Sequence, residues 1–225
     1  VTLPEVRYAK LADQWQFTER ALEQLSALPG VEQSAASFGL PLTDTRFQLT
    51  FTIDRKESED PANEARGQVR VASVDYFDVM GIPLIKGRSF KAEDRWESPQ
   101  VIVVSQELAR RYFPSGEAIG HYLEAGWGRD GRKLGREIVG IVGDLRHQRL
   151  DAPPNPELYL NYLQAPPYAP LVVIRTTADP AELAASIRSA LHDVDPTILP
   201  LNIKTMSELR SASVAPRIFL MALIG

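Results

Sequence analysis

The stretch VIVVSQELARRYFP, residues 101–114, carries the plainest fold signal in the chain. Its first four residues are all apolar and β-branched, which is typical of a strand that is buried on both faces. Ser105 follows at the N-cap position of a helix expected over residues 106–113, with Leu108, Ala109 and Tyr112 facing inward. Pro114 and Gly116 end that helix. The stretch therefore predicts a buried strand followed directly by a short helix.

Further helices and strands are expected on the N-terminal side of this stretch and just after it. Residues 48–53 alternate between polar and apolar side chains, as a half-buried strand does. Gly81 stands where a left-handed helix cap is needed. The other strands are expected over residues 31–38, 68–74, 121–125, 137–142 and 157–162, and the helices over residues 11–28 and 75–80.

The last third of the chain has a regular strand–helix–strand pattern. Leu171–Thr176 predicts a strand, and Asp179 with Pro180 predicts the N-cap and first position of a helix. Leu199–Lys204 is expected to return as a strand parallel to the first, because such crossovers join parallel strands. Thr205–Glu208 has the pattern of a capping box for a last short helix.

The composition excludes several classes of protein and site. The 225 residues carry 25 Lys and Arg against 29 Asp and Glu, and this net charge of −4 disfavours a nucleic-acid-binding protein. Cysteine is absent, so no disulfide or thiolate site can form. The three histidines are not spaced as metal ligands, and no phosphate-binding Gly-Lys-Ser/Thr motif occurs. We therefore predict no catalytic, metal or cofactor site in this chain.

A local basic cluster forms the one candidate contact site. Trp127, Arg129, Arg132 and Lys133, with Arg136 beside them, lie at the expected tip of the hairpin between residues 121–125 and 137–142. Gly126, Gly128 and Gly131 match the dinucleotide-binding spacing, but a strand rather than a helix is expected to follow them. The cluster is either a solvated loop or a contact surface for a partner protein or an anionic lipid.

An ordered set of segments comprises residues 74–84, 86–90, 101–114, 138–144 and 156–159. In their order and spacing these segments resemble the MacB-type periplasmic core domain of ABC-transporter permeases, the FtsX-like permease family. In that family the domain lies between the first and second transmembrane helices. The apolar run over residues 214–225 would then begin a transmembrane segment.

The resemblance implies an α+β fold with two lobes. A split porter-like lobe of βαβ-type units would comprise residues 1–88 and 166–213, and a smaller, mainly β lobe would be inserted at residues 89–165. The alternation of helices and strands near both ends, with short strands between, agrees with this division.

The resemblance also implies a non-catalytic role in the periplasm, as part of an inner-membrane protein. The domain would transmit ATP-driven conformational change from the membrane part for efflux or export. Its partners would be its own transmembrane segments, a nucleotide-binding ATPase domain and a periplasmic adaptor protein, in a dimeric transporter. Two alternatives stay open from the residues alone. They are a free-standing extracytoplasmic module that binds a ligand or peptide, and an enzyme whose site the sequence does not show.

Overall fold

The computed structural model describes residue 4 and residues 7–41, 47–56, 64–127, 133–145, 154–167, 169–198 and 202–211. The helices are α1 (Leu11–Ser26), α2 (Tyr76–Met80), α3 (Gln106–Tyr112) and α4 (Pro180–Val194), and a short helix follows over residues 206–211. The strands are β1 (Val31–Phe38), β2 (Gln48–Ile53), β3 (Ala65–Ala72), β4 (Leu84–Gly87), β5 (Val101–Ser105), β6 (Tyr122–Trp127), β7 (Lys133–Val142), β8 (Glu157–Asn161) and β9 (Leu171–Thr176).

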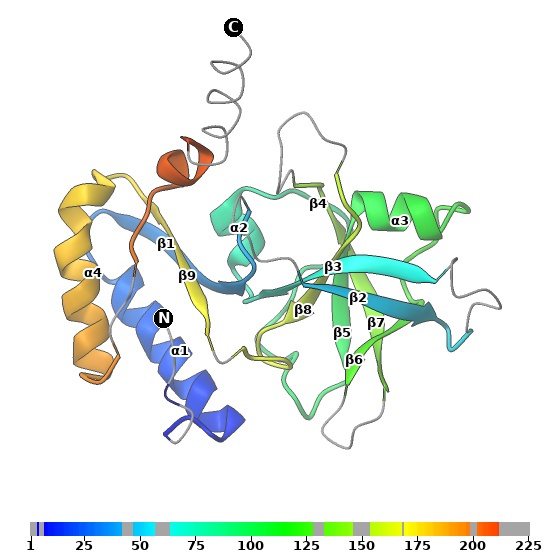
Figure 1. Cartoon of the computed structure of the whole chain (residues 1–225), viewed down its shortest axis with the longest axis horizontal. Helices are drawn as coiled ribbons and strands as arrows, with labels where there is room; N and C mark the ends of the chain where they lie inside the picture. The colour runs from blue at the N-terminus through cyan, green and yellow to red at the C-terminus, as the bar shows by residue number, and fades with distance from the viewer. Residues whose placement is uncertain are drawn as a thin grey trace, which may run out of the picture.

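The strands pair into one mixed sheet, and part of this sheet closes on itself (Figure 1). From β2 the sheet runs through β6, β7, β5 and β8 to β3, and β3 pairs again with β2 over Gln48–Phe51. These six strands therefore form a closed ring. The β3–β8 and β5–β7 pairs are parallel, whereas the other pairs are antiparallel. Closure removes the two unpaired edges that an open sheet would have.

The ring encloses an apolar core to which all six of its strands contribute. Leu108 of α3 and the following Phe113 also belong to this core. On the outer face of β5, Val101 and Val103 pack with Phe77 of α2 in a second cluster. The strand is thus buried on both faces, as its unbroken apolar sequence predicts. The strand residues inside the ring are Phe51, Val69, Val71, Ile102, Val104, Leu123, Ala125, Ile138, Ile141, Leu158 and Leu160.

The sheet continues beyond the ring through β1 and β9, which helices cover on both sides (Figure 1). On one side, α1 and α4 form a third apolar cluster against Val172 and Ile174 of β9. On the other side, Val173 of the same strand packs against the cluster that contains α2. The alternating side chains of β9 therefore bury apolar surface against two different groups of helices.

Helix α1 joins this helical layer to the ring. Phe17, Ala21 and Leu25 face α4 in the third cluster, whereas Trp15 and Leu22 pack against the core of the ring. The hydroxyl groups of Thr18 and Tyr162 hydrogen-bond at 2.6 Å, next to the C-terminal end of β8. Two faces of one helix are thus buried against the two parts of the molecule.

The predicted helix caps are confirmed. The side chain of Ser105 accepts a hydrogen bond from Leu108 N–H at 3.2 Å, and that of Asp179 accepts one from Ala181 N–H at 2.9 Å. Gly81 ends α2 in the left-handed region with a φ of 67°. The capping box also forms, because Thr205 N–H donates to Glu208 at 2.6 Å and Glu208 N–H donates to Thr205 at 3.1 Å.

The prediction of a parallel strand over Leu199–Lys204 is wrong for residues 202–204, which the structure describes. Residues 202–204 belong to no strand, and β9 pairs antiparallel with β1. After α4 the chain turns at Asp195, and Ile198 is buried in the cluster between α1 and α4. Ile203 packs against the same cluster. Ile198 and Ile203 therefore cover helices, and the described residues 202–204 complete no βαβ unit.

The predicted lobe boundaries at residues 88 and 166 stay a prediction. The sheet joins the two predicted lobes, since β2 and β3 pair with β6 and β8. No helix in the described ranges is both long and apolar enough to cross a membrane. The expected transmembrane start at residues 214–225 lies outside the described residues.

Candidate functional site

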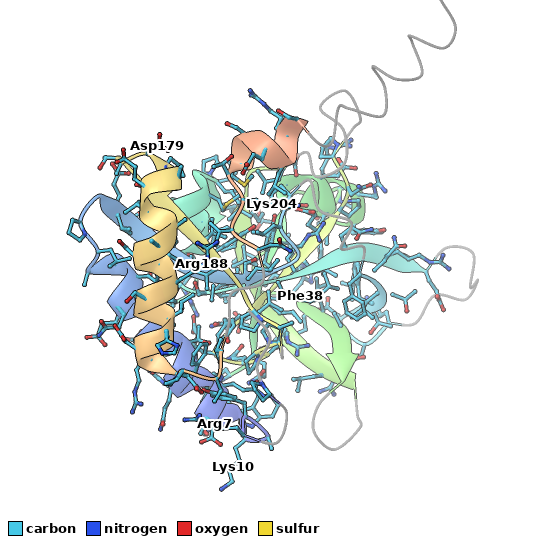
Figure 2. The ribbon with its side chains drawn as sticks, turned by 60° about the vertical axis from the view of Figure 1, so that its left-hand side comes forward. Arg7, Lys10, Phe38, Asp179, Arg188 and Lys204 are labelled. Carbon is cyan, nitrogen blue, oxygen red and sulfur yellow. The ribbon has the colours of Figure 1, made fainter. Side chains whose placement is uncertain are left out.

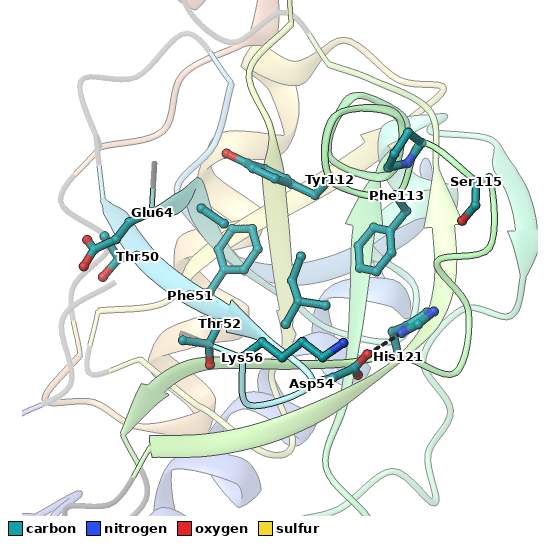
Figure 3. Close-up of a pocket in the computed structure, with 13 residues that line it drawn as sticks. Thr50, Phe51, Thr52, Asp54, Lys56, Glu64, Tyr112, Phe113, Ser115 and His121 are labelled. Atoms are coloured by element: carbon teal, nitrogen blue, oxygen red, sulfur yellow. Dashed lines mark hydrogen bonds and ion pairs between the residues drawn. The ribbon is translucent and has the colours of Figure 1, made fainter. Parts of the chain in front are cut away.

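A groove of about 590 Å³ lies between β2 and the C-terminal end of α3, and part of its lining belongs to the core of the ring (Figure 3). Its walls come from β2 with the turn that follows it, the start of β3, the chain after α3, and His121. The lining residues are 50–54, 56, 64–65, 112–115 and 121.

Aromatic side chains form the floor of this groove. The rings of Phe51 and Tyr112 meet edge to face, with centroids 5.2 Å apart. The Tyr112 hydroxyl accepts a hydrogen bond from Arg66 N–H and donates one to Arg66 C=O, both at 3.0 Å. Contacts from β2, β3 and α3 therefore fix the position of the floor.

One end of the groove carries an acid–base pair. Asp54 Oδ2 lies 2.6 Å from His121 Nδ1, and Tyr122 N–H donates to Asp54 Oδ1 at 3.0 Å. The hydrogen bond from Tyr122, and to a smaller extent that with His121, lowers the pKa of Asp54 below its ordinary value. Asp54 and Arg55 have φ values of 50° and 61°, which non-glycine residues adopt at a cost. The contacts of the Asp54 carboxylate thus hold the turn after β2 in an unfavourable conformation.

The groove is open to solvent, and its lining combines apolar and ionisable groups. It joins an apolar floor to a carboxylate, an imidazole and the amine of Lys56, which is the general make-up of a binding pocket. Among the side chains that the structure describes, no group of three or more His, Cys, Asp or Glu could hold a metal ion. Sequence reasoning missed this groove, because Asp54 and His121 are 67 positions apart.

A buried charge network lies where β3 and β8 run side by side. Arg70 Nε is 3.5 Å from Glu157 Oε1, and their side chains are 4% and 1% exposed. The Tyr159 hydroxyl donates to Glu157 Oε2 at 2.6 Å, and Glu157 N–H donates to Ser105 at 3.0 Å. Burial, together with the charge of Glu157, raises the pKa of Tyr159 well above its ordinary value. Glu157 therefore links its own strand to β3 through its carboxylate and to β5 through its backbone N–H.

Two of the predicted contact residues, Trp127 and Lys133, lie where β6 ends and where β7 begins. Trp127 and Lys133 pair across the two strands there, whereas Arg129 and Arg132 lie outside the described residues. Arg136 does not share the surface cluster that the sequence assigned to it. Its side chain is buried and donates to Ala125 C=O, because its position opposite Leu123 turns it inward. Burial lowers the pKa of Arg136 to about 10.

Comparison with known proteins assigns the chain to a family. Residues 5–190 match the family model described as the MacB-like periplasmic core domain. The chain belongs to this family. The match confirms the resemblance that the segments between residues 74 and 159 indicate. The chain is accordingly a periplasmic domain of a MacB/FtsX-like ABC permease, which is an inner-membrane protein.

One curated relative is the macrolide export ATP-binding/permease protein MacB 1/2 of Paracoccus denitrificans (strain Pd 1222). This MacB-like domain is 30% identical to it over 81 residues, which are 36% of the chain and 11% of the relative. The matched stretch is thus a small part of a much longer protein.

Solved structures of periplasmic and extracellular domains share the fold. The periplasmic region of MacB from Actinobacillus actinomycetemcomitans aligns with a TM-score of 0.54 at 15% identity, over 77% of this chain and 72% of that one. The extracellular domain of the noncanonic ABC-type transporter YknZ from Gram-positive bacteria aligns with a TM-score of 0.51 at 18% identity, over 78% and 82%. The mixed sheet with its covering helices is therefore the fold of such domains.

Proposed function

We propose that this domain transmits ATP-driven conformational change from the membrane part of its transporter into the periplasm, for efflux or export. The observation that carries the proposal is the family match over residues 5–190. In this proposal the domain carries out no chemistry itself. Its partners are its own transmembrane segments, a nucleotide-binding ATPase domain and a periplasmic adaptor protein, in a dimeric transporter.

The packing of the domain supports a mechanical role. A domain that passes on movement has to behave as a packed body rather than as loosely joined parts. Helix α1 contributes to the core of the ring and to the core of the helical layer. We propose that the helical layer belongs to the porter-like lobe at residues 1–88 and 166–213, and that residues 89–165 form the inserted lobe.

The gene that encodes this chain provides the most direct test of the proposal. We expect its reading frame to continue on both sides with several apolar segments of ~20 residues, one of which starts at about residue 214. Sequencing of the flanking DNA checks this. A reading frame that contains no such segments on either side would contradict the proposed role.

We also propose that the hairpin tip contacts the adaptor protein through Trp127, Arg129, Arg132 and Lys133. An aromatic side chain beside several cations is a composition that favours protein interfaces. Reversal of the three charges by Arg129→Glu, Arg132→Glu and Lys133→Glu is expected to lower capture of the purified adaptor about tenfold, or about 1.4 kcal/mol. A pull-down with the immobilised chain measures the captured amount.

The matched control reverses three exposed cations on another face. Lys10→Glu, Arg20→Glu and Arg188→Glu change the net charge equally, on the exposed side of α1 and α4. This control variant is expected to capture the adaptor like the parent chain. Equal losses in both variants would show that net charge, and not the hairpin tip, determines binding.

A further inference from the structure

The segment before α1 and the turn after α4 meet at one carboxylate, although they are 188 positions apart in the chain. Arg7 Nη1 donates to Asp195 Oδ1 at 3.0 Å, and the Tyr8 hydroxyl donates to Asp195 Oδ2. Thr197 donates to Asp195 Oδ1 from its N–H at 2.9 Å and from its hydroxyl at 2.7 Å. Both carboxylate oxygens are thus occupied, one of them shared by the two segments.

The carboxylate is deeply buried and still charged. The Asp195 side chain is 1% exposed. Burial raises its pKa, but the hydrogen bonds from Tyr8 and Thr197 and the charge of Arg7 outweigh this and hold the pKa below its ordinary value. Burial and the bond to Asp195 raise the pKa of Tyr8 to about 12. Asp195 therefore stays ionised and Tyr8 stays neutral near neutral pH, so that protonation is not the event that opens this contact.

The start of α1 depends on this contact because it has no cap of its own. Lys10 occupies the N-cap position and makes no side-chain capping bond. Instead, Gln14 Nε2 donates to Tyr8 C=O at 2.7 Å, and the Tyr8 ring meets Phe17 edge to face at 5.5 Å. The first turns of α1 are thus fixed through Tyr8, and Tyr8 is in turn fixed by Asp195.

We infer that Arg7, Tyr8, Asp195 and Thr197 form a latch that makes the entry to α1 and the exit from α4 move as one unit. Figure 2 shows Arg7 at the end of the molecule where α4 finishes, opposite the end marked by Asp179. In the proposed function, on which this mechanical role rests, movement would reach the domain through the chain on both sides. The latch would pass a displacement of one segment directly to the other, without relying on the ring.

Hydrogen exchange of the whole 225-residue chain tests the latch. Asp195→Asn removes the charge and keeps the shape, and Tyr8→Phe removes only one hydroxyl. Each is expected to speed amide exchange at residues 7–14 at least fivefold, while amides of β5 exchange as in the parent. Asp193→Asn, an exposed position near the end of α4, is the matched control and is expected to change nothing. If Asp195→Asn prevents folding, Tyr8→Phe alone decides the result.

Each outcome bears on one claim only. Unchanged exchange at residues 7–14 in the folded variants would overturn the latch, whatever the transporter does. If exchange rises as expected, Asp195→Asn in the full-length transporter is expected to lower export at least threefold while ATP hydrolysis continues. Unaltered export would overturn the role of the latch in transport. A failure of the proposed function itself would be seen in the flanking gene sequence, which is independent of Asp195.

Discussion

Replacement of Gly140 by alanine is expected to destabilise the domain by about 3 kcal/mol, near the upper end of the cost of overpacking a core. A Cβ atom at this position would lie 2.1 Å from the carbonyl oxygen of Arg88, which belongs to the backbone next to β4. The adjacent Arg88 N–H donates to Val139 C=O at 2.8 Å, so this backbone cannot withdraw without loss of a hydrogen bond. Thermal unfolding followed by circular dichroism should show a midpoint about 6–12 °C lower.

Gly135 provides a matched control in the same strand. A Cβ atom there would have Glu124 Cγ as its nearest neighbour, at an ordinary distance of 3.8 Å, and neither glycine has a positive φ. Gly135→Ala is therefore expected to change the stability by no more than about 0.5 kcal/mol. Equal losses in the two variants would mean that strand β7 is sensitive to any added methyl group, and that the approach of Arg88 is not the cause.

Elements with strong local signals could be predicted from the sequence. The buried strand β5 and the N-cap at Ser105 depend on neighbouring residues, and both form as expected. The same holds for α4, whose start at Asp179 and Pro180 is encoded in two adjacent residues. For both helix starts the capping hydrogen bond spans at most three positions, so the pattern and its physical cause lie in the same short stretch.

Closure of the ring could not be predicted in this way. Alternation over Gln48–Ile53 shows which side chains of β2 face inward, but it does not show which strands lie beside it. In the structure β2 pairs with β3 through Gln48–Phe51 and with β6 through Thr52 and Ile53. These pairings join residues that are up to 72 positions apart, as Thr52 and Glu124 are.

The erroneous strand over Leu199–Lys204 has a related cause. Apolar side chains that recur at short spacing fit a half-buried strand, and they fit equally well a segment lying across helices. Ile198 and Ile203 take the second arrangement against α1 and α4. The Asp195 carboxylate binds Arg7 and Tyr8 and so fixes the course of the chain at the turn. The sequence near Asp195 contains no pattern that predicts these distant partners.

The groove with Asp54 and His121 could not be predicted because its residues are far apart in the sequence. The buried charge of Arg70 could not be predicted for a different reason. Arg70 alternates with Val69 and Val71, which is the pattern of a side chain that faces solvent from a half-buried strand. Other parts of the chain cover this outer face of β3. The backbone at Gly39 comes so close that a Cβ atom there would lie 2.6 Å from Arg70 Nη1. A charged residue in a strand, here Arg70, is therefore not necessarily exposed to solvent.

Replacement of Arg70 by alanine is expected to cost about 3–5 kcal/mol of folding free energy, the range for removal of one partner from a buried ion pair. The carboxylate of Glu157, which is 1% exposed in the parent structure, would lose the guanidinium that lies 3.5 Å from it. Its hydrogen bond from Tyr159 would not supply the missing positive charge. Urea unfolding should show a lower midpoint, and an unchanged dependence on urea would indicate that the native state keeps its compactness.

Two comparisons separate the charge effect from loss of packing. Lys86→Ala removes the cation of an exposed pair, in which Lys86 and Glu117 are 50% and 73% exposed, and it is expected to cost less than about 1 kcal/mol. Arg70→Met keeps much of the side-chain volume, and the double variant Arg70→Met, Glu157→Gln also removes the buried charge. We expect the double variant to be more stable than Arg70→Met alone, because neither charge is then left buried without the other. If adding Glu157→Gln to Arg70→Met does not restore stability, the loss of folding free energy at Arg70 arises from lost packing contacts with Gly39 and the surrounding strands. The Glu157 carboxylate would then tolerate the loss of its charged partner.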